Sequence, residues 1–369
     1  MLIVKQFAPR MQNDSQSKAI LLMNLGSPDS FENKDVKKYL TEFLMDERVI
    51  DISQPFRSLL VKGIIVPFRT SGSAAKYKTI WTKDGSPLVH LTATLTKAVS
   101  ATTDIPAAFC MRYGSPTAKD TLEELQATFP DLDELIVLPL YPHYAMSSYE
   151  TAVEDVKDAF SKKNYSFSLK IVPPFYNHPA YINALAQSMA PYLQAEYDLM
   201  LFSYHGIPER HVKKTDPNKN HCLEQKDCCN VDSPAHHFCY RHQVFETTKL
   251  TAQHLRLPKD KYSVSFQSRL GRDKWLQPAT AELLKELPAK GIKKLVIACP
   301  AFVSDCLETL EEIEMEGREI FMEAGGESYT LIPCLNTLPV WVEAVGTIIK
   351  DMDKRDFDVK SKAAKELIS

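Results

Sequence analysis

The stretch Leu199-Met-Leu-Phe-Ser-Tyr-His-Gly-Ile-Pro208 decides the fold class. Its first half is an apolar run with almost no polar alternation, which is typical of a parallel strand covered on both faces. The run then enters a loop, where Gly206 permits a sharp turn and Pro208 fixes the exit of the chain. The pattern predicts a buried strand whose carboxyl end carries His205.

Other apolar runs have the same character, at residues 19–24, 135–140 and 295–299. Between them the apolar residues recur at helical spacing, which predicts helices at 118–128, 149–162, 178–193, 243–254, 280–287 and 307–323. Strands that alternate with helices indicate the α/β class with doubly wound parallel sheets.

Two pairs of segments resemble each other: Met23-Asn-Leu-Gly-Ser-Pro28 with 203–208, and 135–151 with 295–309. The matches predict two duplicated Rossmann-like lobes, in which His205 corresponds to Leu25 and Glu308 to Glu150. We expect an N-terminal lobe at 1–165, a C-terminal lobe at 166–335 with a cysteine-rich insertion near 212–239, and a helical extension at 336–369. In such sheets ligands bind beyond the carboxyl ends of the strands.

Composition excludes some classes of protein. The chain has 369 residues and a net charge of −3, whereas nucleic-acid-binding proteins carry basic patches. Its first residues are not a secretion signal, because Lys5 and Arg10 interrupt them, and no run reaches the roughly 20 apolar residues of a membrane span. We therefore expect a cytoplasmic protein with reduced cysteines.

The segment 56–68 is the most apolar surface candidate. It is too short to cross a bilayer. It is either a core segment or an exposed lip that makes peripheral contact with a membrane or with an apolar substrate.

His205 and a late acidic helix carry the chemistry. A histidine at a strand end acts as a base or a metal ligand near neutral pH, or else is a core residue bonded to a carbonyl. Glu308, Glu312 and Glu316 recur at every fourth position, so they share one helix face although like charges there repel. Such a ladder suits a divalent cation, or it is a solvated acidic face.

Aromatic and basic side chains accompany this pair. Tyr141, Tyr144, Tyr204, Trp275 and Phe302 flank the predicted strand ends, and Arg112 follows a short strand. Together they indicate a flat apolar slot with cationic edges, which suits a large planar molecule with acidic substituents.

These segments together resemble the ferrochelatase family, whose members insert ferrous iron into a porphyrin at the end of haem synthesis. The matching segments follow the order of the family and cover nearly the whole chain: 21–28, 77–81, 85–88, 111–114, 138–142, 203–208, 266–271, 275–276 and 304–310.

The resemblance implies two Rossmann-like lobes with the porphyrin between them, and Fe²⁺ as the second substrate. His205 and Glu308 would be the central pair that faces the macrocycle, and Glu312 and Glu316 would continue the line of metal-binding acids. The segment 56–68 would be the apolar lip, and Cys306 lies where some members have a histidine. The porphyrin would contact Leu25, Arg69, Ser86, Arg112, Tyr141, Trp275 and Phe302.

Protoporphyrin IX is the favoured substrate, with coproporphyrin III as the alternative. Two pyrrole N–H protons must leave as iron enters, so the pocket should favour a buckled macrocycle. Rival functions are a cobalt or nickel chelatase of the same fold, and a porphyrin or haem carrier without catalysis.

Four of the eight cysteines lie close together: Cys222, Cys228, Cys229 and Cys239. Certain ferrochelatases carry a [2Fe–2S] cluster on an internal cysteine segment, and four thiolates in a short loop suit such a cluster. The alternatives are zinc with help from His221, His236 or His237, and a segment without metal.

Overall fold

The computed structural model describes residues 17–269, 271 and 273–352, which form two compact units. Unit 1 contains the chain up to Leu140, Ser147–Pro173 and the chain from Val345 onward, and unit 2 contains Tyr141–Met146 and Pro174–Ala344. The N-terminal residues 1–16 and the part of the expected helical extension beyond residue 352 lie outside the described residues.

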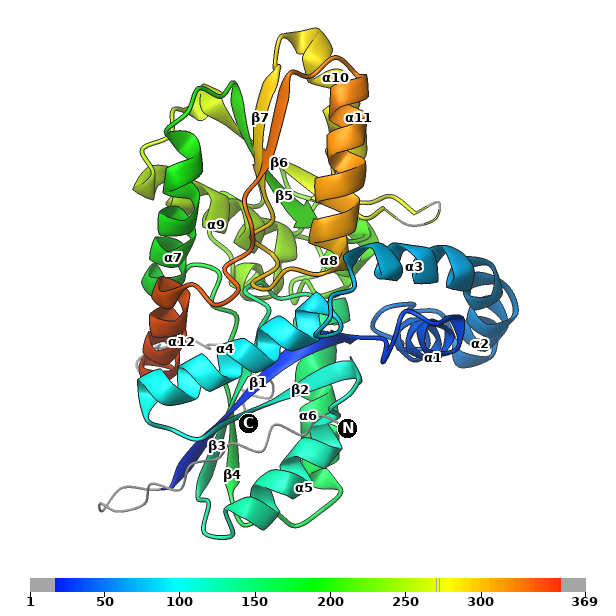
Figure 1. Cartoon of the computed structure of the whole chain (residues 1–369), viewed down its shortest axis with the longest axis vertical. Coiled ribbons are helices and arrows are strands. Elements are labelled where there is room, and N and C mark those ends of the chain that lie inside the picture. Colours follow the sequence, from blue (N-terminus) through cyan, green and yellow to red (C-terminus); the bar gives the residue numbers. More distant parts are fainter. Residues whose placement is uncertain (1–16, 270, 272, 353–369) are drawn as a thin grey trace. The chain divides into compact units, whose positions relative to one another are not determined.

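Unit 1 is built on a four-stranded parallel sheet with the order β2-β1-β3-β4 (Figure 1). The central strands are almost wholly buried because their side chains are apolar on both faces. The strands are β1 (Lys18–Ser27), β2 (Ala107–Gly114), β3 (Glu134–Pro139) and β4 (Ser168–Ile171).

Helices surround this sheet. Helix α4 packs on β1 and β2, α5 packs with α6 and β2, and α1 packs on α3. Thr117 accepts a bond from the Asp120 N–H and so caps the start of α5. The helices are α1 (Asn33–Leu44), α2 (Gln54–Leu60), the π-helix η1 (Val61–Ile65), α3 (Val66–Ile80), α4 (Pro87–Thr103), α5 (Ala118–Thr128) and α6 (Thr151–Ser161).

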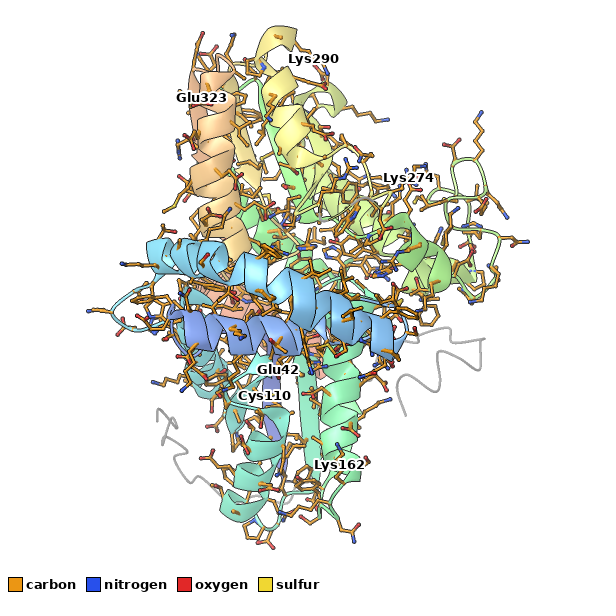
Figure 2. All side chains as sticks on the ribbon, turned by 90° about the vertical axis from the view of Figure 1, so that its right-hand side faces the viewer. Glu42, Cys110, Lys162, Lys274, Lys290 and Glu323 are labelled. Atoms are coloured by element: carbon orange, nitrogen blue, oxygen red, sulfur yellow. The ribbon has the colours of Figure 1, made fainter. Side chains whose placement is uncertain are left out.

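Side-chain burial follows the sheet. Cys110 of β2 is fully buried inside unit 1, whereas Lys162 at the end of α6 points away from it (Figure 2). The short π-helix η2 (Met146–Glu150) and the last described helix, α12 (Pro339–Asp351), are each divided between the two units.

Unit 2 has a second four-stranded parallel sheet, with the order β6-β5-β7-β8. Its core includes Leu199, Leu201, Leu295 and Ile297 from the two central strands, packed against Phe321. The strands are β5 (Leu199–His205), β6 (Tyr262–Gln267), β7 (Lys294–Ala298) and β8 (Ser328–Leu331).

The helices of unit 2 place the candidate site residues. Helix α9 packs on α7 and β6, and α10 packs on β6 and α11. The helices are α7 (Pro179–Met189), η3 (Ala190–Leu193), α8 (Glu209–Lys214), η4 (Pro234–Phe238), α9 (Tyr240–His254), η5 (Lys259–Lys261), α10 (Thr280–Glu286), η6 (Pro288–Lys290), the π-helix η7 (Glu308–Gly317) and α11 (Arg318–Glu323).

The two units repeat one strand order, which confirms the predicted duplication of the fold. The repeat extends to hydrogen bonds: Met111 N–H donates to the Pro116 carbonyl in unit 1, and Phe266 N–H donates to the Pro278 carbonyl in unit 2. The residues that follow, Arg112 and Gln267, are therefore equivalent positions.

The cysteine-rich segment is not an insertion that lengthens the second copy. The connection between the first two strands covers 28–106 in unit 1 but only 206–261 in unit 2. The segment lies in the shorter connection, between α8 and α9, where unit 1 instead has α1 to α4.

Candidate functional site

His205 is the last residue of β5, and its side chain is half-buried. Its Nδ1 lies 2.6 Å from the carbonyl oxygen of Gly206. Because a carbonyl oxygen only accepts hydrogen bonds, Nδ1 carries the hydrogen in the neutral ring and Nε2 keeps its lone pair. The imidazole therefore presents a basic nitrogen, and the Phe302 ring lies beside it at 6.2 Å between centroids.

Gly206 is required by its close neighbours. A Cβ atom at this position would lie 2.7 Å from the Gln267 carbonyl oxygen and 3.2 Å from the ring of Trp275. The Gly206 N–H also donates to that Gln267 oxygen at 2.7 Å. The absence of a side chain thus lets the loop after His205 pass close to β6.

Glu308 begins η7, a π-helix and not the α-helix that the spacing predicts. Just before it, the buried Asp305 accepts bonds from Asn336 Nδ2 (2.6 Å) and Thr309 Oγ1 (3.0 Å). Gln267 Nε2 donates to the Glu308 carbonyl oxygen at 3.0 Å. The start of η7 is therefore held from several sides.

Glu312 is fixed by Ser268, whose backbone N–H and hydroxyl both donate to its carboxylate. Burial raises the pKa of Glu312, and the Glu308 charge acts in the same direction, whereas Ser268 and His205 lower it. Glu312 is therefore within electrostatic reach of both His205 and Glu308. Such a set can both accept protons and attract a cation.

The rest of the predicted ladder is more exposed. Glu316 lies in the last turn of η7 with its side chain exposed. Arg318 forms an ion pair with Glu314.

Burial raises the pKa of Cys306 well above its usual value, and the neighbouring Glu308 carboxylate adds to this. Cys306 therefore stays a neutral thiol next to the first acid.

Three of the residues predicted to contact a porphyrin lie in unit 2. Tyr141 is buried, whereas Trp275 and Phe302 are half-buried. Trp275 forms a bridge with Pro208 and packs over Gly206, and Phe302 neighbours the His205 ring. These two aromatic residues and His205 are therefore grouped at one end of β5.

The other four lie in unit 1, and they do not form one group. Leu25 is in β1 and half-buried, the buried Ser86 precedes α4, and Arg69 is exposed on α3. Arg112 donates to Asp46 at 2.5 Å, to Thr151 at 2.8 Å and to Asp155 at 3.5 Å. No described contact joins Arg69 or Ser86 to this network.

The charges within the Arg112 network offset one another. Burial raises the pKa of Asp155 to about 6, and Arg112 opposes this shift. Asp46 also accepts a bond from the Tyr113 hydroxyl at 2.9 Å. The guanidinium of Arg112 is thus engaged by the protein itself.

Much of the segment 56–68 is exposed, although Val61 and Val66 within it are buried. Phe56, Leu59, Ile64 and Phe68, which we term the apolar lip, are 69%, 69%, 52% and 82% exposed. Arg57 between them is buried and donates to the carbonyls of Ile50 and Ile52, which anchors the segment. No helix among the described residues is long and apolar enough to cross a membrane.

The four clustered cysteines converge. All eight cysteines are described, and each is a buried free thiol. The Cys222 thiol beside Cys239 raises the pKa of Cys239 to about 12, and Cys239 in turn raises the pKa of Cys229. Among the described residues, no group of three or more His, Cys, Asp or Glu side chains is arranged around a single metal ion.

Polar groups surround these thiols. Arg241 Nη1 lies 3.2 Å from the Cys229 sulfur and 3.9 Å from that of Cys228, and the Leu223 N–H donates to Cys228 at 3.3 Å. His221 and His236 bond the Cys228 carbonyl through Nε2. The histidines thus bond the backbone of the cysteine loop.

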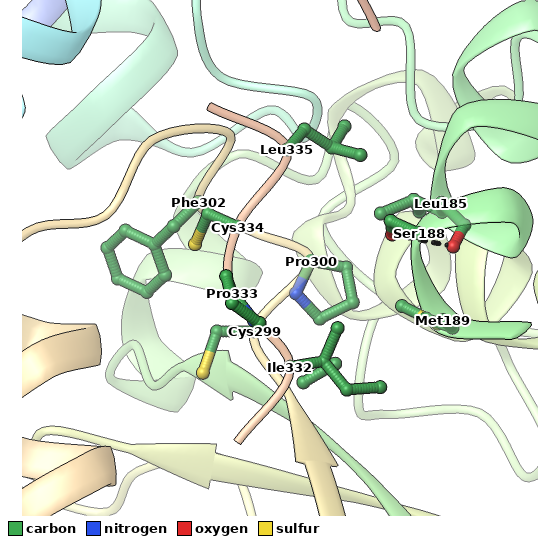
Figure 3. A pocket seen from close by; sticks show the side chains of 11 residues that line it. Leu185, Ser188, Met189, Cys299, Pro300, Phe302, Ile332, Pro333, Cys334 and Leu335 are labelled. Carbon is green, nitrogen blue, oxygen red and sulfur yellow. Dashed lines mark hydrogen bonds between the residues drawn. The ribbon is translucent and has the colours of Figure 1, made fainter. Parts of the chain in front are cut away.

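Two cavities in unit 2 lack the predicted catalytic pair. One, of about 10 Å³, lies beside Cys299, Phe302 and Cys334 (Figure 3) and has room for about one water molecule. The other, of about 460 Å³, lies between α7 and the end of α9, where Arg256 is one of the lining residues. Neither is lined by His205 or Glu308.

Sequence patterns missed the residues that position the acids: Gln267, Ser268, Asp305 and Asn336. Gln267 and Ser268 are in the matching segment 266–271, but no local pattern indicates that they reach η7, about 40 residues later. Asp46 is likewise 66 residues from Arg112.

Comparison with known proteins gives one family. Residues 17–353 match the profile of the family described as Ferrochelatase. A ferrochelatase of Opitutus terrae is 48% identical over 337 residues, which cover 90% of this chain and 97% of that protein. Those of Pseudomonas entomophila and Porphyromonas gingivalis are 47% and 44% identical, over 89% and 92% of this chain and 97% of each relative.

A solved structure is similar in fold. The structure described as SirB from Bacillus subtilis with Fe³⁺ matches with a TM-score of 0.53 and 13% identity. The match covers 93% of this chain and 99% of that one. It supports the α/β fold with two parallel sheets.

Proposed function

The chain belongs to the ferrochelatase family, and from this premise we propose that His205 and Glu308 exchange the pyrrole protons of a porphyrin for Fe²⁺. The enzyme is a lyase that inserts iron into a porphyrin in haem biosynthesis. The observation that carries the assignment of residues is a set of contacts at one end of the unit 2 sheet. Gln267, the register partner of His205, donates to the Glu308 backbone, and Ser268 donates to the Glu312 carboxylate.

His205 acts as the base. Its Nδ1 is engaged by the Gly206 carbonyl, so Nε2 offers the lone pair that takes a pyrrole proton. The cation formed is stabilised by the neighbouring Glu312 carboxylate, because opposite charges at close range attract. A metal bond to His205 would need the same lone pair, so the two roles exclude each other at one time.

Glu308 takes the second proton and passes it to Glu312. The raised pKa of Glu312 makes this carboxylate a ready acceptor, and the exposed Glu316 continues the acidic line toward solvent. Two protons leave and one Fe²⁺ enters, so the charge of the porphyrin does not change. The same acids attract the incoming divalent ion, since oxygen ligands suit it.

Trp275, Phe302, Tyr141 and Leu25 would supply apolar contacts to the macrocycle, and Arg69 and Ser86 would meet its carboxylates. Arg112 is a weaker candidate for a direct contact, because its donors already serve Asp46, Thr151 and Asp155. We propose protoporphyrin IX as the substrate. The exposed apolar lip suits this less acidic porphyrin better than coproporphyrin III.

Glu308→Gln and His205→Ala test the assignment. General acid–base catalysis contributes about 10²–10⁴-fold, so each variant should lose at least about 100-fold in iron insertion while porphyrin fluorescence still reports binding. Glu319→Gln, an exposed acid of α11, is the matched control. Normal insertion by Glu308→Gln would exclude the proposed role.

A substrate panel separates the rival functions. Insertion of Fe²⁺ and Zn²⁺ into protoporphyrin, with little insertion of Co²⁺ or Ni²⁺ into other tetrapyrroles, is expected. Tight porphyrin binding without any metal insertion would instead identify a carrier. Faster turnover of coproporphyrin III would reassign the substrate.

We further propose that Cys222, Cys228, Cys229 and Cys239 hold a [2Fe–2S] cluster. Four buried free thiols that neighbour one another in the order Cys222, Cys239, Cys229 and Cys228 fit a centre that takes four thiolates, and N–H donors near the sulfurs are a usual feature of such sites. When bound, the cluster would supply a structural link or one-electron redox sensing. The zinc alternative draws on His221, His236 or His237, and the first two bond the Cys228 carbonyl through Nε2.

Iron and acid-labile sulfide analysis tests the cluster. We expect about two of each per chain, and a brown colour that bleaches with dithionite. Cys229→Ser should lose both, whereas Cys110→Ser in β2 should keep them. A measured content of one zinc ion per chain, without iron or sulfide, would instead support the zinc alternative.

A further inference from the structure

We propose that Tyr240 is a positioning residue that couples the four-cysteine centre to His205. The inference rests on the cluster proposed above. Three consecutive residues carry it: Cys239 is one of the four thiols, Tyr240 bonds His205, and Arg241 reaches the thiols of Cys228 and Cys229. Because consecutive residues cannot move independently, a movement of the Cys239 thiol displaces Tyr240. The hydrogen bond of Tyr240 then transmits this displacement to the His205 backbone.

The contact with His205 is direct. The Tyr240 hydroxyl donates to the His205 carbonyl oxygen at 2.8 Å. That carbonyl belongs to the peptide that joins His205 to Gly206. The carbonyl of Gly206, one residue further on, accepts a hydrogen bond from His205 Nδ1. Tyr240 therefore fixes the peptide that precedes the acceptor of the imidazole, and through it the direction of Nε2.

Tyr240 is held firmly. Its ring is 5% exposed and packs edge-on against His143, at 5.9 Å between centroids. His143 packs in the same way against Tyr204 at 5.5 Å.

The opposite contacts reach the thiols. Arg241 Nη1 lies 3.2 Å from the Cys229 sulfur, and His242 Nδ1 bonds the Cys229 carbonyl at 2.8 Å. Gln243 donates to the carbonyls of His236 and His237 in the cysteine-rich segment. The first turn of α9 thus rests on the cysteine loop, and releasing that loop would release Tyr240.

The test measures the reactivity of His205 separately from catalysis. Purified wild-type protein and the Tyr240→Phe variant are analysed for iron and sulfide, then treated with diethyl pyrocarbonate before and after a chelator strips the cluster. Mass spectrometry quantifies carbethoxylation of the peptide that contains His205. Kinetic assays give kcat and the KM for porphyrin.

The Tyr240→Phe variant should keep its iron and sulfide. Diethyl pyrocarbonate should modify its His205 about fivefold faster than in the wild type, and kcat should fall by a similar factor, because one buried hydrogen bond is lost. Stripped wild-type protein should react like the variant, and stripping the variant should add little. The control is Tyr149→Phe, which loses a tyrosine bond of 2.9 Å to the Val172 carbonyl in unit 1. It should behave like the wild type.

Two results would overturn the coupling. If iron and sulfide are present but His205 reacts equally with and without them, the cluster stands and the coupling fails. If the wild-type protein contains no iron or sulfide, the cluster proposal fails first, and the coupling fails with it.

Discussion

Ser268 donates both its backbone N–H and its hydroxyl to the Glu312 carboxylate, over 2.7 and 2.5 Å. Both bonds stabilise the charged carboxylate, so they lower a pKa that burial raises. Ser268→Ala removes the hydroxyl and should raise the pKa of Glu312 further. The acidic limb of the pH–rate profile for kcat should then move to higher pH, by about half a unit to one unit.

Ser263→Ala is the control for this prediction. Ser263 lies in β6, the strand that Ser268 follows, but makes no described bond to η7. Its pH profile should match that of the wild type. An unchanged profile in Ser268→Ala would mean that Glu312 does not take part in the rate-limiting proton transfer.

Gly206→Ala should damage both stability and catalysis. The new methyl group would lie 2.7 Å from the Gln267 carbonyl oxygen, which cannot move without disturbing β6. We expect a loss of about 1–3 kcal/mol in the free energy of unfolding, measured in urea, together with a lower kcat. Gly72→Ala in α3, where nothing lies within 4 Å, should instead gain about 0.5–1 kcal/mol. Equal stabilities would show that the loop has room to adjust.

Arg112→Met should act mainly through stability. Removing the guanidinium leaves Asp46 and Asp155 without their cation, which costs about 3–5 kcal/mol for a buried pair. Because Arg112 lowers the pKa of Asp155, that carboxylate should protonate at a higher pH in the variant. The deficit should therefore shrink as the pH falls toward about 6 and Asp155 becomes neutral in the variant.

Thermal unfolding across this pH range, together with the KM for porphyrin, checks the prediction. Arg112→Lys should keep part of the stability, since it keeps the charge but not the fork of donors. A normal melting temperature with a much higher KM would mean that Arg112 serves the porphyrin directly.

The apolar lip should bind lipid surfaces, an expectation that follows from its exposure. Changing Phe56, Leu59 and Phe68 together to serine should reduce co-sedimentation with phosphatidylcholine and phosphatidylglycerol vesicles at least about tenfold. The thermal unfolding midpoint serves as the readout of folding. If the variant still sediments with vesicles, the lip is not the contact.

Local patterns predicted the central strands of both sheets, β1, β3, β5 and β7, because apolar runs and helical spacing are properties of neighbouring residues. The predicted helix at 118–128 coincides with α5, since Thr117 caps it and Leu122 and Leu125 mark its buried face. The helices within 33–103 were not predicted. They lie between the first two strands of unit 1, where unit 2 has the shorter connection with the cysteines. The internal repeat therefore could not be used to predict them.

The finer site geometry depends on contacts that no local pattern shows. Spacing predicted an α-helix at 307–323, but Gln267, Ser268 and Asn336 hold its first part from distant segments, and it is a π-helix. The exposure of the apolar lip could not be decided from hydrophobicity alone, because a core segment has the same composition.

Arg112 and Gln267 occupy the same place in the two repeated units, and each reaches the helix that follows the third strand. In unit 1 the reaching group is cationic and needs Asp46 as its counterion. In unit 2 it is a neutral amide, which secures the backbone without adding a positive charge. Gln267 therefore adds no positive charge next to Glu308 and Glu312, where a guanidinium would repel an approaching metal dication.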